Sequence, residues 1–401
     1  MKLKDYLKQY LSKKELNKIK TSYDIVGDIA IIELTEGLED KEKLIAEGIL
    51  KINKNIKTIL KKSGIHEGTF RTQKLEYVLG EKKKETIYKE NNIKLIINPE
   101  KVYFSPRLST ERKILLENLK PKKVLVMFSG AGPYSLVAYK FQPNHKRITS
   151  IEINPEGHKY ALKNLEINKS IARKNRYYKE LKKFATEKLG FFNEKEILNK
   201  ISNLTLQFIN GDVKKEVYKF KLRKVENLNI DYNLDNLENI SDKEILNIKK
   251  SIILLENVNF ENILKFIFLY NNNNFIYKNF IFKTNLEKNY LLEILEEVFY
   301  NNKDILNNKN EINEIIKYDE IFMPLPKDAK MFLEEAFYMA KKNSIIHLYD
   351  FVKEEDFPQI TINKINKISK EKNRKIKILQ SRKVGQYSPR KYRVCIDFKI
   401  L

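Results

Sequence analysis

Hydrophobic and polar residues along the first hundred positions follow short strand and helix periods. Residues 22–35, SYDIVGDIAIIELT, contain an apolar, β-branched run after a Gly-Asp turn, and this run predicts a strand. Residues 40–62 carry several isoleucines at helical spacing on one face, which predicts a helix. Two strand-like runs, ETIYKEN and IKLIINP, follow within residues 84–104. Together these elements predict a small α+β domain over residues 1–104.

Beyond residue 104 the pattern changes to alternating strands and helices. A helical stretch over 109–119 precedes an apolar strand, a glycine-rich turn and a helix within 122–141. A second strand, turn and helix follow within 147–169. Strands that alternate with helices in this way predict a parallel, doubly wound sheet, and thus an α/β domain.

The alternation weakens after Lys169 and returns towards the C-terminus. A strand is predicted over 204–212, whereas residues 214–317 are rich in Lys, Asn and Ile and retain apolar runs, which predicts a partly folded insertion. The later elements predicted are a strand at YDEIFMPLP, a helix at KMFLEEAFYMAKK, a strand at SIIHLYDF, and an antiparallel terminal pair at KIKILQSRKVGQYSP and KYRVCIDFKI. Residues 105–401 are therefore predicted to form one domain that contains the insertion.

Composition narrows the class of protein. The 401 residues include one cysteine and four scattered histidines. A disulfide framework and a cysteine-based zinc site are therefore excluded, and we expect no metal. The sequence lacks an apolar run of about eighteen residues and an apolar signal core, so we expect a cytoplasmic protein without a membrane partner.

The net charge of +24 favours a polyanionic partner, because lysines that neutralise phosphates release counterions. Lysine, asparagine and isoleucine are over-used along the whole chain, however, as in proteins from AT-rich genomes. Charge alone therefore leaves nucleic-acid binding and compositional bias equally open.

The sharpest local signal is the turn FSGAGPY over residues 128–134, directly after an apolar strand. Glycine lets backbone N–H groups approach a ligand closely. At the end of the next strand, Glu152 is placed to accept hydrogen bonds from ribose hydroxyls. The combination predicts a nucleoside-containing cofactor, and a plain tight turn with a surface glutamate is the alternative. The dinucleotide fingerprint would need a third glycine where Ser135 stands, so S-adenosyl-L-methionine is favoured over NAD.

Two further strand ends carry candidate chemistry. Asp212 follows the third predicted strand, where an acid can accept a hydrogen bond from an adenine amino group. Pro324 and Pro326 follow the fourth strand and predict a rigid loop that could support a planar base. Each feature alone is equally typical of an ordinary turn or connection.

Several short stretches of the chain, in their order and spacing, resemble those of the archaeal and eukaryotic tRNA (guanine-37, N1)-methyltransferases and their relatives in the wybutosine pathway. The matching stretches are SYDIVGDIAIIEL, GTFRTQKLEYVLGE, KVYFSPRLSTER, FSGAGPY, IEINP, FMPLPKDA, IIHLYDF and YSPRKYRVCIDFKI. The resemblance covers roughly residues 10–168 and 318–401. It implies a small RNA-binding domain followed by a class I methyltransferase domain with a Rossmann-like sheet. It also implies S-adenosyl-L-methionine as the cofactor and tRNA as the partner.

The resemblance also implies roles for particular residues. A guanine N1 carries a proton that must leave before the nitrogen can attack a methyl group. Glu111 stands at the position of the family's general base, and Arg71 at that of the arginine that stabilises charge on guanine O6. The residues implied in cofactor binding are Tyr103, Phe128, Gly130, Gly132, Glu152, Ile153, Asp212 and Val213. Those implied in substrate binding are Arg107, Pro324 and Pro326.

Plainer roles exist for both catalytic candidates. Glu111 could form an ordinary surface ion pair with Arg107 or Arg112, which is what most such glutamates do. Arg71 could contact a phosphate and fix the register of an RNA without taking part in the chemistry.

The chain departs from the family pattern in three places. Pro324 stands where relatives often have an asparagine, and Val126 where many have an aspartate. The chain also begins close to the second domain of many relatives, so we expect the domain that inspects the tRNA outer corner to be absent. Residues 214–317 are a hypothetical source of replacement tRNA contacts.

The leading hypothesis is methyl transfer to N1 of guanosine 37 in tRNA, next to the anticodon, by a monomeric enzyme. A second hypothesis is a wyosine-pathway transfer of a methyl or aminocarboxypropyl group to a modified base 37. The third is a tRNA-binding relative without catalysis, against which the presence of both Glu111 and Arg71 argues.

Overall fold

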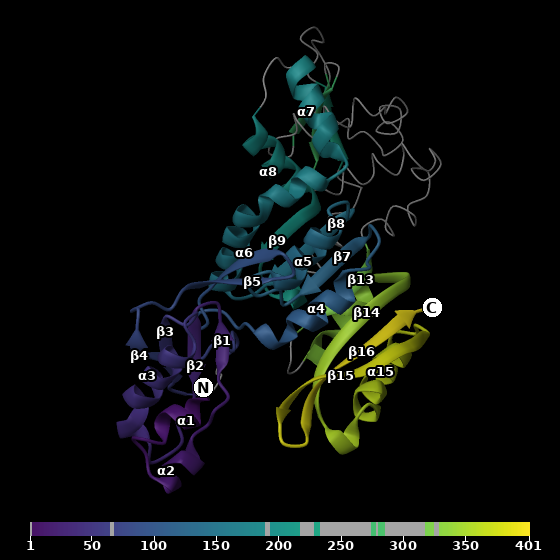
Figure 1. Ribbon diagram of the computed structural model, residues 1–401. Coiled ribbons are helices and arrows are strands. Elements are labelled where there is room, and N and C mark those ends of the chain that lie inside the picture. Colours follow the sequence, from purple (N-terminus) through teal and green to yellow (C-terminus); the bar gives the residue numbers. More distant parts are fainter. Residues whose placement is uncertain are drawn as a thin grey trace. The chain divides into compact units, whose positions relative to one another are not determined.

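The computed structural model describes residues 2–64, 68–188, 193–216, 228–232, 274–277, 280–284, 317–324 and 329–401 (Figure 1). The chain divides into two compact units. The first comprises residues 1–117, 129–140 and 152–168, and the second comprises residues 118–128, 141–151 and 169–401. No helix among these described residues is long and apolar enough to cross a membrane.

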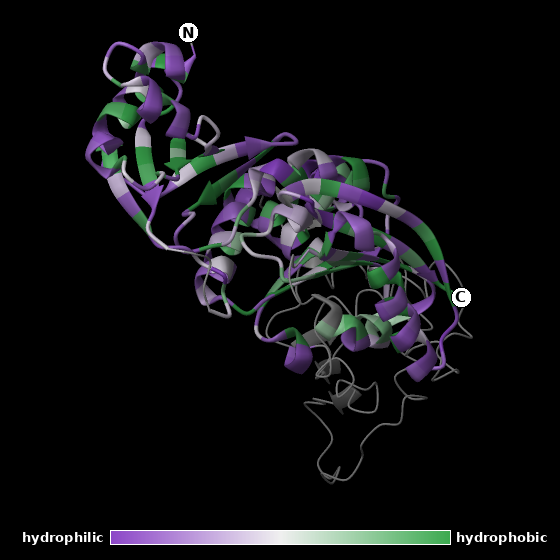
Figure 2. Ribbon diagram, turned by 90° about the horizontal axis from the view of Figure 1, so that it is seen from below, coloured by the Kyte–Doolittle hydropathy of each residue, from purple (hydrophilic) through white to green (hydrophobic). Residues whose placement is uncertain are grey.

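The N-terminal part of the first unit is a four-stranded sheet with helices. Its elements are α1 Leu3–Leu7, α2 Lys13–Lys18, β1 Asp24–Val26, β2 Ile29–Ile32, α3 Glu42–Ile52, β3 Thr58–Lys62 and β4 Leu75–Gly80. The strands lie in the order β1-β2-β3-β4, with β2 and β3 parallel and the other pairs antiparallel. Ile45 and Ile49 of α3 pack with Ile59 of β3 in one core cluster. Figure 2 shows hydrophobic segments of the chain beside hydrophilic ones in this part.

The strand predicted after the Gly-Asp turn is β2, and the short β1 before the turn pairs with it, because Gly27 adopts a φ of +59° and reverses the chain between them. One predicted element of this part was wrong in extent. The helix predicted over 40–62 ends at Ile52, and its last residues form β3 instead. Asn53 ends the helix in an extended conformation, and its side-chain oxygen accepts a hydrogen bond from the backbone N–H of Asn55 (3.2 Å).

A two-stranded hairpin follows in the same unit, with β5 at Thr86–Glu90 and β6 at Ile93–Ile97. Asn91 and Asn92 join the strands, and their positive φ angles of 45° and 59° are those of a tight hairpin turn. The remaining helices here are α4 Ser109–Leu116, α5 Pro133–Phe141 and α6 Pro155–Asn168.

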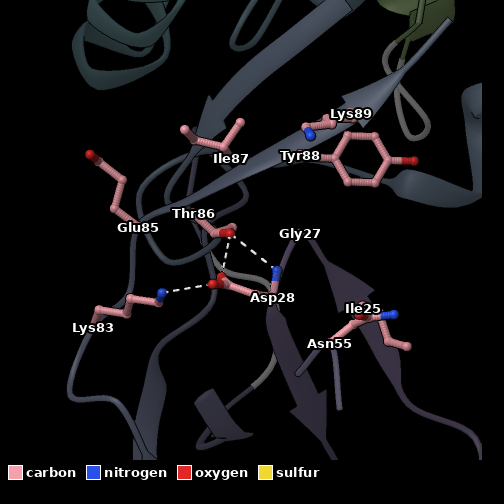
Figure 3. A pocket seen from close by; sticks show the side chains of 10 residues that line it. All are labelled: Ile25, Gly27, Asp28, Asn55, Lys83, Glu85, Thr86, Ile87, Tyr88 and Lys89. Carbon is pink, nitrogen blue, oxygen red and sulfur yellow. Dashed lines mark hydrogen bonds and ion pairs between the residues drawn. The ribbon is translucent and has the colours of Figure 1, made fainter. Parts of the chain in front are cut away.

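A groove of about 640 Å³ lies between the β1–β2 turn and β5 (Figure 3). Its lining residues are Ile25, Gly27, Asp28, Asn55, Lys83, Glu85, Thr86, Ile87, Tyr88 and Lys89. The Thr86 hydroxyl donates to Asp28 (2.6 Å), which also pairs with Lys83 (2.7 Å). A Cβ on Gly27 would lie 2.7 Å from the backbone oxygen of Ile87, so the close approach requires glycine.

The second unit contains a seven-stranded sheet. Its strands are β7 Lys123–Met127, β8 Arg147–Glu152, β9 Leu206–Asn210, β13 Tyr318–Met323, β14 Ala340–Lys353, β15 Ile376–Ser388 and β16 Lys391–Ile400. They lie in the order β9-β8-β7-β13-β14-β16-β15. β7 pairs in parallel with β8 and β13, and β13 in parallel with β14, whereas β16 runs antiparallel to both its neighbours. The predicted doubly wound sheet and antiparallel terminal pair are confirmed.

Helices and a second small sheet complete this unit. The helices and 3-10 turns among the described residues are η3 Lys169–Lys174, α7 Tyr177–Lys188, α8 Glu194–Thr205, η6 Ala329–Phe332, α14 Leu333–Met339, η7 Glu354–Asp356 and α15 Gln359–Glu371. Within the predicted insertion, β10 Leu228–Tyr232, β11 Asn274–Tyr277 and β12 Phe280–Thr284 form an antiparallel sheet. Most other residues of 214–317 lie outside the described ranges.

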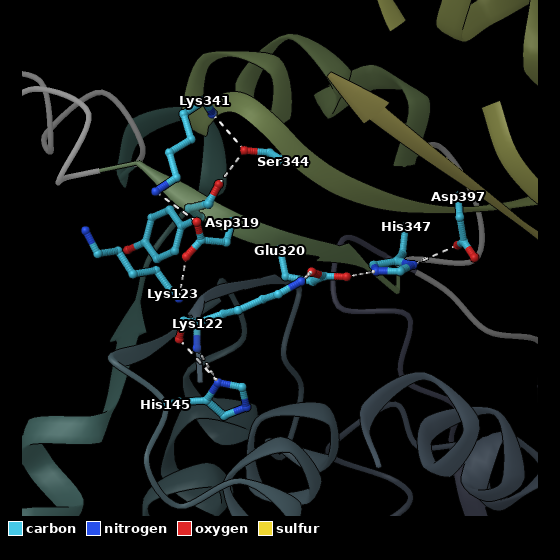
Figure 4. A network of polar contacts seen from close by, with 10 residues as sticks. Lys122, Lys123, His145, Asp319, Glu320, Lys341, Ser344, His347 and Asp397 are labelled. Atoms are coloured by element: carbon cyan, nitrogen blue, oxygen red, sulfur yellow. Dashed lines mark hydrogen bonds and ion pairs between the residues drawn. The ribbon is translucent and has the colours of Figure 1, made fainter. Parts of the chain in front are cut away.

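A mostly buried chain of charged side chains connects neighbouring strands of the seven-stranded sheet (Figure 4). Nδ1 of His347 lies 2.7 Å from Asp397, and its Nε2 lies 2.8 Å from Glu320, which in turn pairs with Lys122 (2.7 Å). Asp397 also pairs with Arg382. Burial alone would lower the pKa of His347, but hydrogen bonds to Asp397 and Glu320 outweigh it and raise this pKa to about 9. The imidazole is therefore held as a cation between two carboxylates.

We expect the stability of the protein to fall as pH rises above neutrality, because His347 must lose its proton. Its pKa is about 9 in the folded state against an ordinary value of 6.5, so the stabilisation is complete below pH 6.5 and is lost towards pH 9. The shift corresponds to roughly 3 kcal/mol. Urea unfolding of the wild type and of His347→Gln between pH 6 and 10 measures it, with a flatter profile for the variant.

His145 provides a control, because the shift of its pKa has the opposite sign from that of His347. Burial lowers its pKa to about 4, so this histidine is neutral in the folded protein and opposes folding only as pH falls below 6.5. His145→Gln should change the acid side of the profile and leave the alkaline side as in the wild type. Parallel alkaline profiles for the wild type and His347→Gln would contradict the proposed cation.

Candidate cofactor and catalytic site

The glycine-rich turn begins at the carboxyl end of β7 and leads into α5. Phe128, Gly130 and Gly132 all have positive φ angles of 63°, 55° and 82°. The N–H of Gly132 donates to the Ser129 oxygen (2.9 Å), and the Gly132 oxygen accepts from Leu136 in the first turn of α5 (3.0 Å). The turn thus leaves the strand sharply and enters the helix without a linker, as the sequence predicts.

Glu152 lies against this turn. The backbone N–H of Gly130 donates to its Oε2 (2.6 Å), and the N–H of Asn154 donates to its Oε1 (2.8 Å). Burial raises the pKa of this carboxyl, and hydrogen bonds from the backbone of Asn154, Gly130 and Ile153 partly offset the rise. A carboxylate oxygen can accept more than one hydrogen bond, so Glu152 retains capacity for a ribose hydroxyl.

The segment that carries Tyr103 is bound to the residues that follow Glu152. The side-chain amide of Asn154 donates to the Lys101 oxygen (2.8 Å), and Lys101 pairs with Glu156 (2.9 Å). The backbone oxygen of Tyr103 would lie 3.5 Å from a Cβ on Gly130. Ile153, directly after Glu152, is 37% exposed and offers an apolar face. The structure thus gathers most of the predicted cofactor residues of the first unit at this turn.

The predicted cofactor residues of the second unit follow β7 and β9. The ring of Phe128 meets the ring of Phe332 edge-on, with centroids 4.7 Å apart. Asp212 accepts a hydrogen bond from the backbone N–H of Lys214 (3.0 Å) and so caps the turn that follows β9. Val213 is buried, with 3% of its side chain exposed.

The sheet has its switch point between β7 and β13, where the strand order reverses. Ligands of doubly wound sheets bind outside the carboxyl ends of the strands at such a point. Phe128 follows β7 directly, and the half-buried Pro324 follows β13. Pro326, the other predicted substrate residue of this loop, lies outside the described residues.

Glu111 occupies the first turn of α4, with 8% of its surface exposed. The next residue, Arg112, is fixed by a buried bidentate ion pair with Glu90 of β5, in which Nε of Arg112 lies 2.6 Å from Oε1 of Glu90. Its guanidinium also lies over the rings of Phe104 and Tyr134, at 5.4 Å and 5.7 Å. The pair therefore anchors the helical turn that presents Glu111.

The two arginines proposed as plain partners of Glu111 are engaged with other acids. Arg112 pairs with Glu90, and the exposed Arg107 pairs with Asp24 (2.7 Å). Arg71 has a φ of 51° in a turn before β4, where its N–H donates to the Gly68 oxygen (3.2 Å). The catalytic roles of Glu111 and Arg71 stay predictions.

Sequence reasoning missed the groove beside β5 and the charged chain around His347. The signals for the groove were the Gly27-Asp28 turn and the lysine run at 82–84. His347, Cys395 and Asp397 offer ligand atoms within 4.8 Å of one another, but Arg382 and the hydrogen bond between His347 and Asp397 already neutralise Asp397. We therefore interpret this cluster as structural.

The strand order, with its antiparallel terminal strand, is that of a class I methyltransferase fold. The glycine turn with its buried acid stays the predicted place for a nucleoside cofactor. The model of the TRM5/TYW2 methyltransferase domain matches residues 86–248 and 278–379, and that of the TYW2 N-terminal domain matches residues 3–83. The chain therefore belongs to the TRM5/TYW2 methyltransferase family, which confirms the resemblance seen in the sequence. S-adenosyl-L-methionine is the cofactor of this family, as predicted.

Two curated relatives differ in how far they match. The tRNA (guanine(37)-N(1))/4-demethylwyosine(37)-methyltransferase Taw22 of Nanoarchaeum equitans is 30% identical over 382 residues, which are 95% of this chain and 100% of that protein. The tRNA (guanine(37)-N(1))-methyltransferase Trm5b of Pyrococcus abyssi is 40% identical over 152 residues. That match spans 38% of this chain and less than half, 45%, of the relative.

Solved structures agree on the fold. The crystal structure of Trm5b from Pyrococcus abyssi has a TM-score of 0.59 and 25% identity, and the match covers 97% of this chain and 78% of that one. The structure of Pyrococcus horikoshii TYW2 in complex with MeSAdo has a TM-score of 0.56 at 17% identity, with 100% and 98% covered. The predicted fold class is thereby confirmed.

We expect the Glu90–Arg112 pair to be essential for the stability of the first unit. Both side chains are at most 2% exposed, so Glu90→Ala would leave a buried, unpaired guanidinium. The expected loss is about 3–5 kcal/mol in the free energy of unfolding, measured by urea denaturation. Replacing both residues, as in Glu90→Leu with Arg112→Met, should cost much less than the single change.

The exposed Arg107–Asp24 pair is the matched control. The Arg107 side chain is 65% exposed, so water screens this pair and Asp24→Ala should cost less than about 1 kcal/mol. Equal losses for Glu90→Ala and Asp24→Ala would show that burial does not set the strength of the anchor.

Proposed function

We propose that this protein transfers a methyl group from S-adenosyl-L-methionine to N1 of guanosine 37 in tRNA. The observation that carries the proposal is the buried Glu111, presented by a helical turn that the Glu90–Arg112 pair anchors, in the same unit as the glycine turn and Glu152. Both relatives described above are named for guanine-37 N1 methylation, and this supports the choice of acceptor.

Each proposed residue has a definite task. The carboxylate of Glu111 accepts the proton of guanine N1, which turns N1 into a nucleophile. The guanidinium of Arg71 faces O6, where negative charge grows as that proton leaves. Glu152 accepts from the ribose hydroxyls, and the turn at Gly130 and Gly132 holds the cofactor close to the backbone. When bound, the cofactor would supply an electrophilic methyl group, and residues that hold the two reactants together would supply much of the rate.

A second acceptor has its own support. The Nanoarchaeum equitans relative, matched over its whole length, is named for 4-demethylwyosine as well as guanine. Pro324 can offer its backbone oxygen but no amide N–H to a base, unlike the asparagine expected there. A tricyclic wyosine base is therefore the alternative substrate at position 37.

We also propose that residues 1–104 bind the tRNA beside the target base, with the remainder acting as the methyltransferase domain. The groove of Figure 3 supports this because it combines the exposed Ile87, the ring of Tyr88 and the exposed Lys89. A base can stack on such a wall while a lysine neutralises its phosphate.

The decisive experiment for the proposed function uses labelled S-adenosyl-L-methionine and two tRNA transcripts that differ only in guanosine or adenosine at position 37. Transfer to the guanosine transcript alone, with the mass gain of one methyl, is expected. In the same assay Glu111→Gln should lower kcat by about 10²–10⁴-fold, and its residual rate should rise with pH as N1 loses its proton to solvent.

Glu117→Gln is the control, because Glu117 is exposed at the end of the same helix and should leave kcat unchanged. Transfer only to tRNA that carries a wyosine precursor would favour the second acceptor. Cofactor binding without transfer to any of these RNAs would favour a non-catalytic tRNA binder.

For the groove, Lys89→Glu should weaken tRNA binding by about 3–10-fold and reduce the slope of log Kd against log salt by roughly one. Lys342→Glu, at an exposed position of β14, is the control for the general effect of charge reversal. Filter binding from 50 to 300 mM salt measures both. Equal effects of the two variants would exclude a specific RNA contact in the groove.

A further inference from the structure

The outer edge of β6 is completed by two asparagines instead of a third strand. The side-chain oxygen of Asn168 accepts from the N–H of Lys94 (3.1 Å), and its amide donates to the Lys94 oxygen (2.7 Å). One helical turn earlier, the side-chain oxygen of Asn164 accepts from the N–H of Ile96 (2.6 Å), and its amide donates to the Ile96 oxygen (3.2 Å). The two residues lie four positions apart on α6, so both amides face the strand.

Asn164 makes one contact that Asn168 does not. Its amide also donates to the backbone oxygen of Ala131 (3.0 Å), which lies between Gly130 and Gly132 in the glycine turn. The side chain of Asn164 is fully buried. An asparagine has two N–H donors, and both are thus committed to fixed carbonyls, one in β6 and one in the turn.

The turn is therefore held from two directions. The N–H of Gly130 binds the Glu152 carboxylate, and the carbonyl of the next residue, Ala131, binds the Asn164 amide. These bonds fix the peptide groups on either side of the 130–131 peptide, in a segment whose glycines could otherwise adopt many conformations. A preformed turn does not have to be ordered when the ligand binds, and this raises affinity.

We propose that Asn164 is a positioning residue for the nucleoside cofactor: it holds the 129–132 turn against β6 in the conformation that binds S-adenosyl-L-methionine. The inference rests on the proposed use of this turn as the cofactor site. Asn164 acts through the turn, and a purely structural role would lower stability without changing the affinity of the folded protein.

Asn168 supplies the matched control for this distinction. Asn164→Asp and Asn168→Asp each exchange an amide donor for a carboxylate oxygen of the same size, on the same helix and against the same strand. Asn164→Asp additionally sets an acceptor against the Ala131 oxygen. Both variants should lower the Tm, but only Asn164→Asp should disturb the turn.

The experiment measures binding of S-adenosyl-homocysteine by titration calorimetry, together with KM for S-adenosyl-L-methionine, KM for tRNA and kcat. We expect Asn164→Asp to raise the Kd and the KM of the cofactor at least tenfold, with KM for tRNA within about twofold. Asn168→Asp should change the cofactor Kd less than threefold. If Asn164→Asp does not fold, the pair Asn164→Ala and Asn168→Ala makes the same comparison.

Equal cofactor affinities in the two variants would overturn the positioning role and leave the proposed function intact. A wild-type protein that does not bind S-adenosyl-homocysteine would overturn the cofactor site itself, and the inference with it. The wild-type titration therefore separates the two failures.

Discussion

The outer edge of β6, which has no strand partner among the described residues, is the constraint on which the first unit depends. A two-stranded hairpin leaves N–H and C=O groups exposed, and buried backbone groups must find partners. Asn164 and Asn168 provide them from a helix. Because β5 of the same hairpin carries Glu90, which pairs with Arg112, one small sheet connects the cofactor turn to the helix of Glu111.

The features that could be predicted from the sequence are those set by local patterns. The glycine turn, its acid Glu152 and the alternating strands appear as short runs of residues with a known period or chemistry. The short strand β1 and the early end of α3 were missed, because β1 has only three residues and Asn53 ends the helix within an apolar pattern that continues through it.

Polar partners that lie far apart in sequence could not be predicted. Asn164 and Ile96, or His347 and Asp397, share no period or motif, and an asparagine on a helix usually indicates a solvent-exposed position. Arg112 illustrates the same limit. Its neighbour in sequence, Glu111, suggested a local ion pair, whereas Arg112 pairs with Glu90, which lies on a separate strand. Such contacts depend on how the chain folds back on itself.

The conformation of Phe128 has a consequence for which residue evolution retains at the start of the turn. A phenylalanine with a φ of +63° is strained by roughly 1–3 kcal/mol, and a glycine there would remove that cost. A glycine would also remove the ring that meets Phe332. Selection for stability alone would thus replace Phe128, so its retention in a lineage would record selection for what the ring does beside the site.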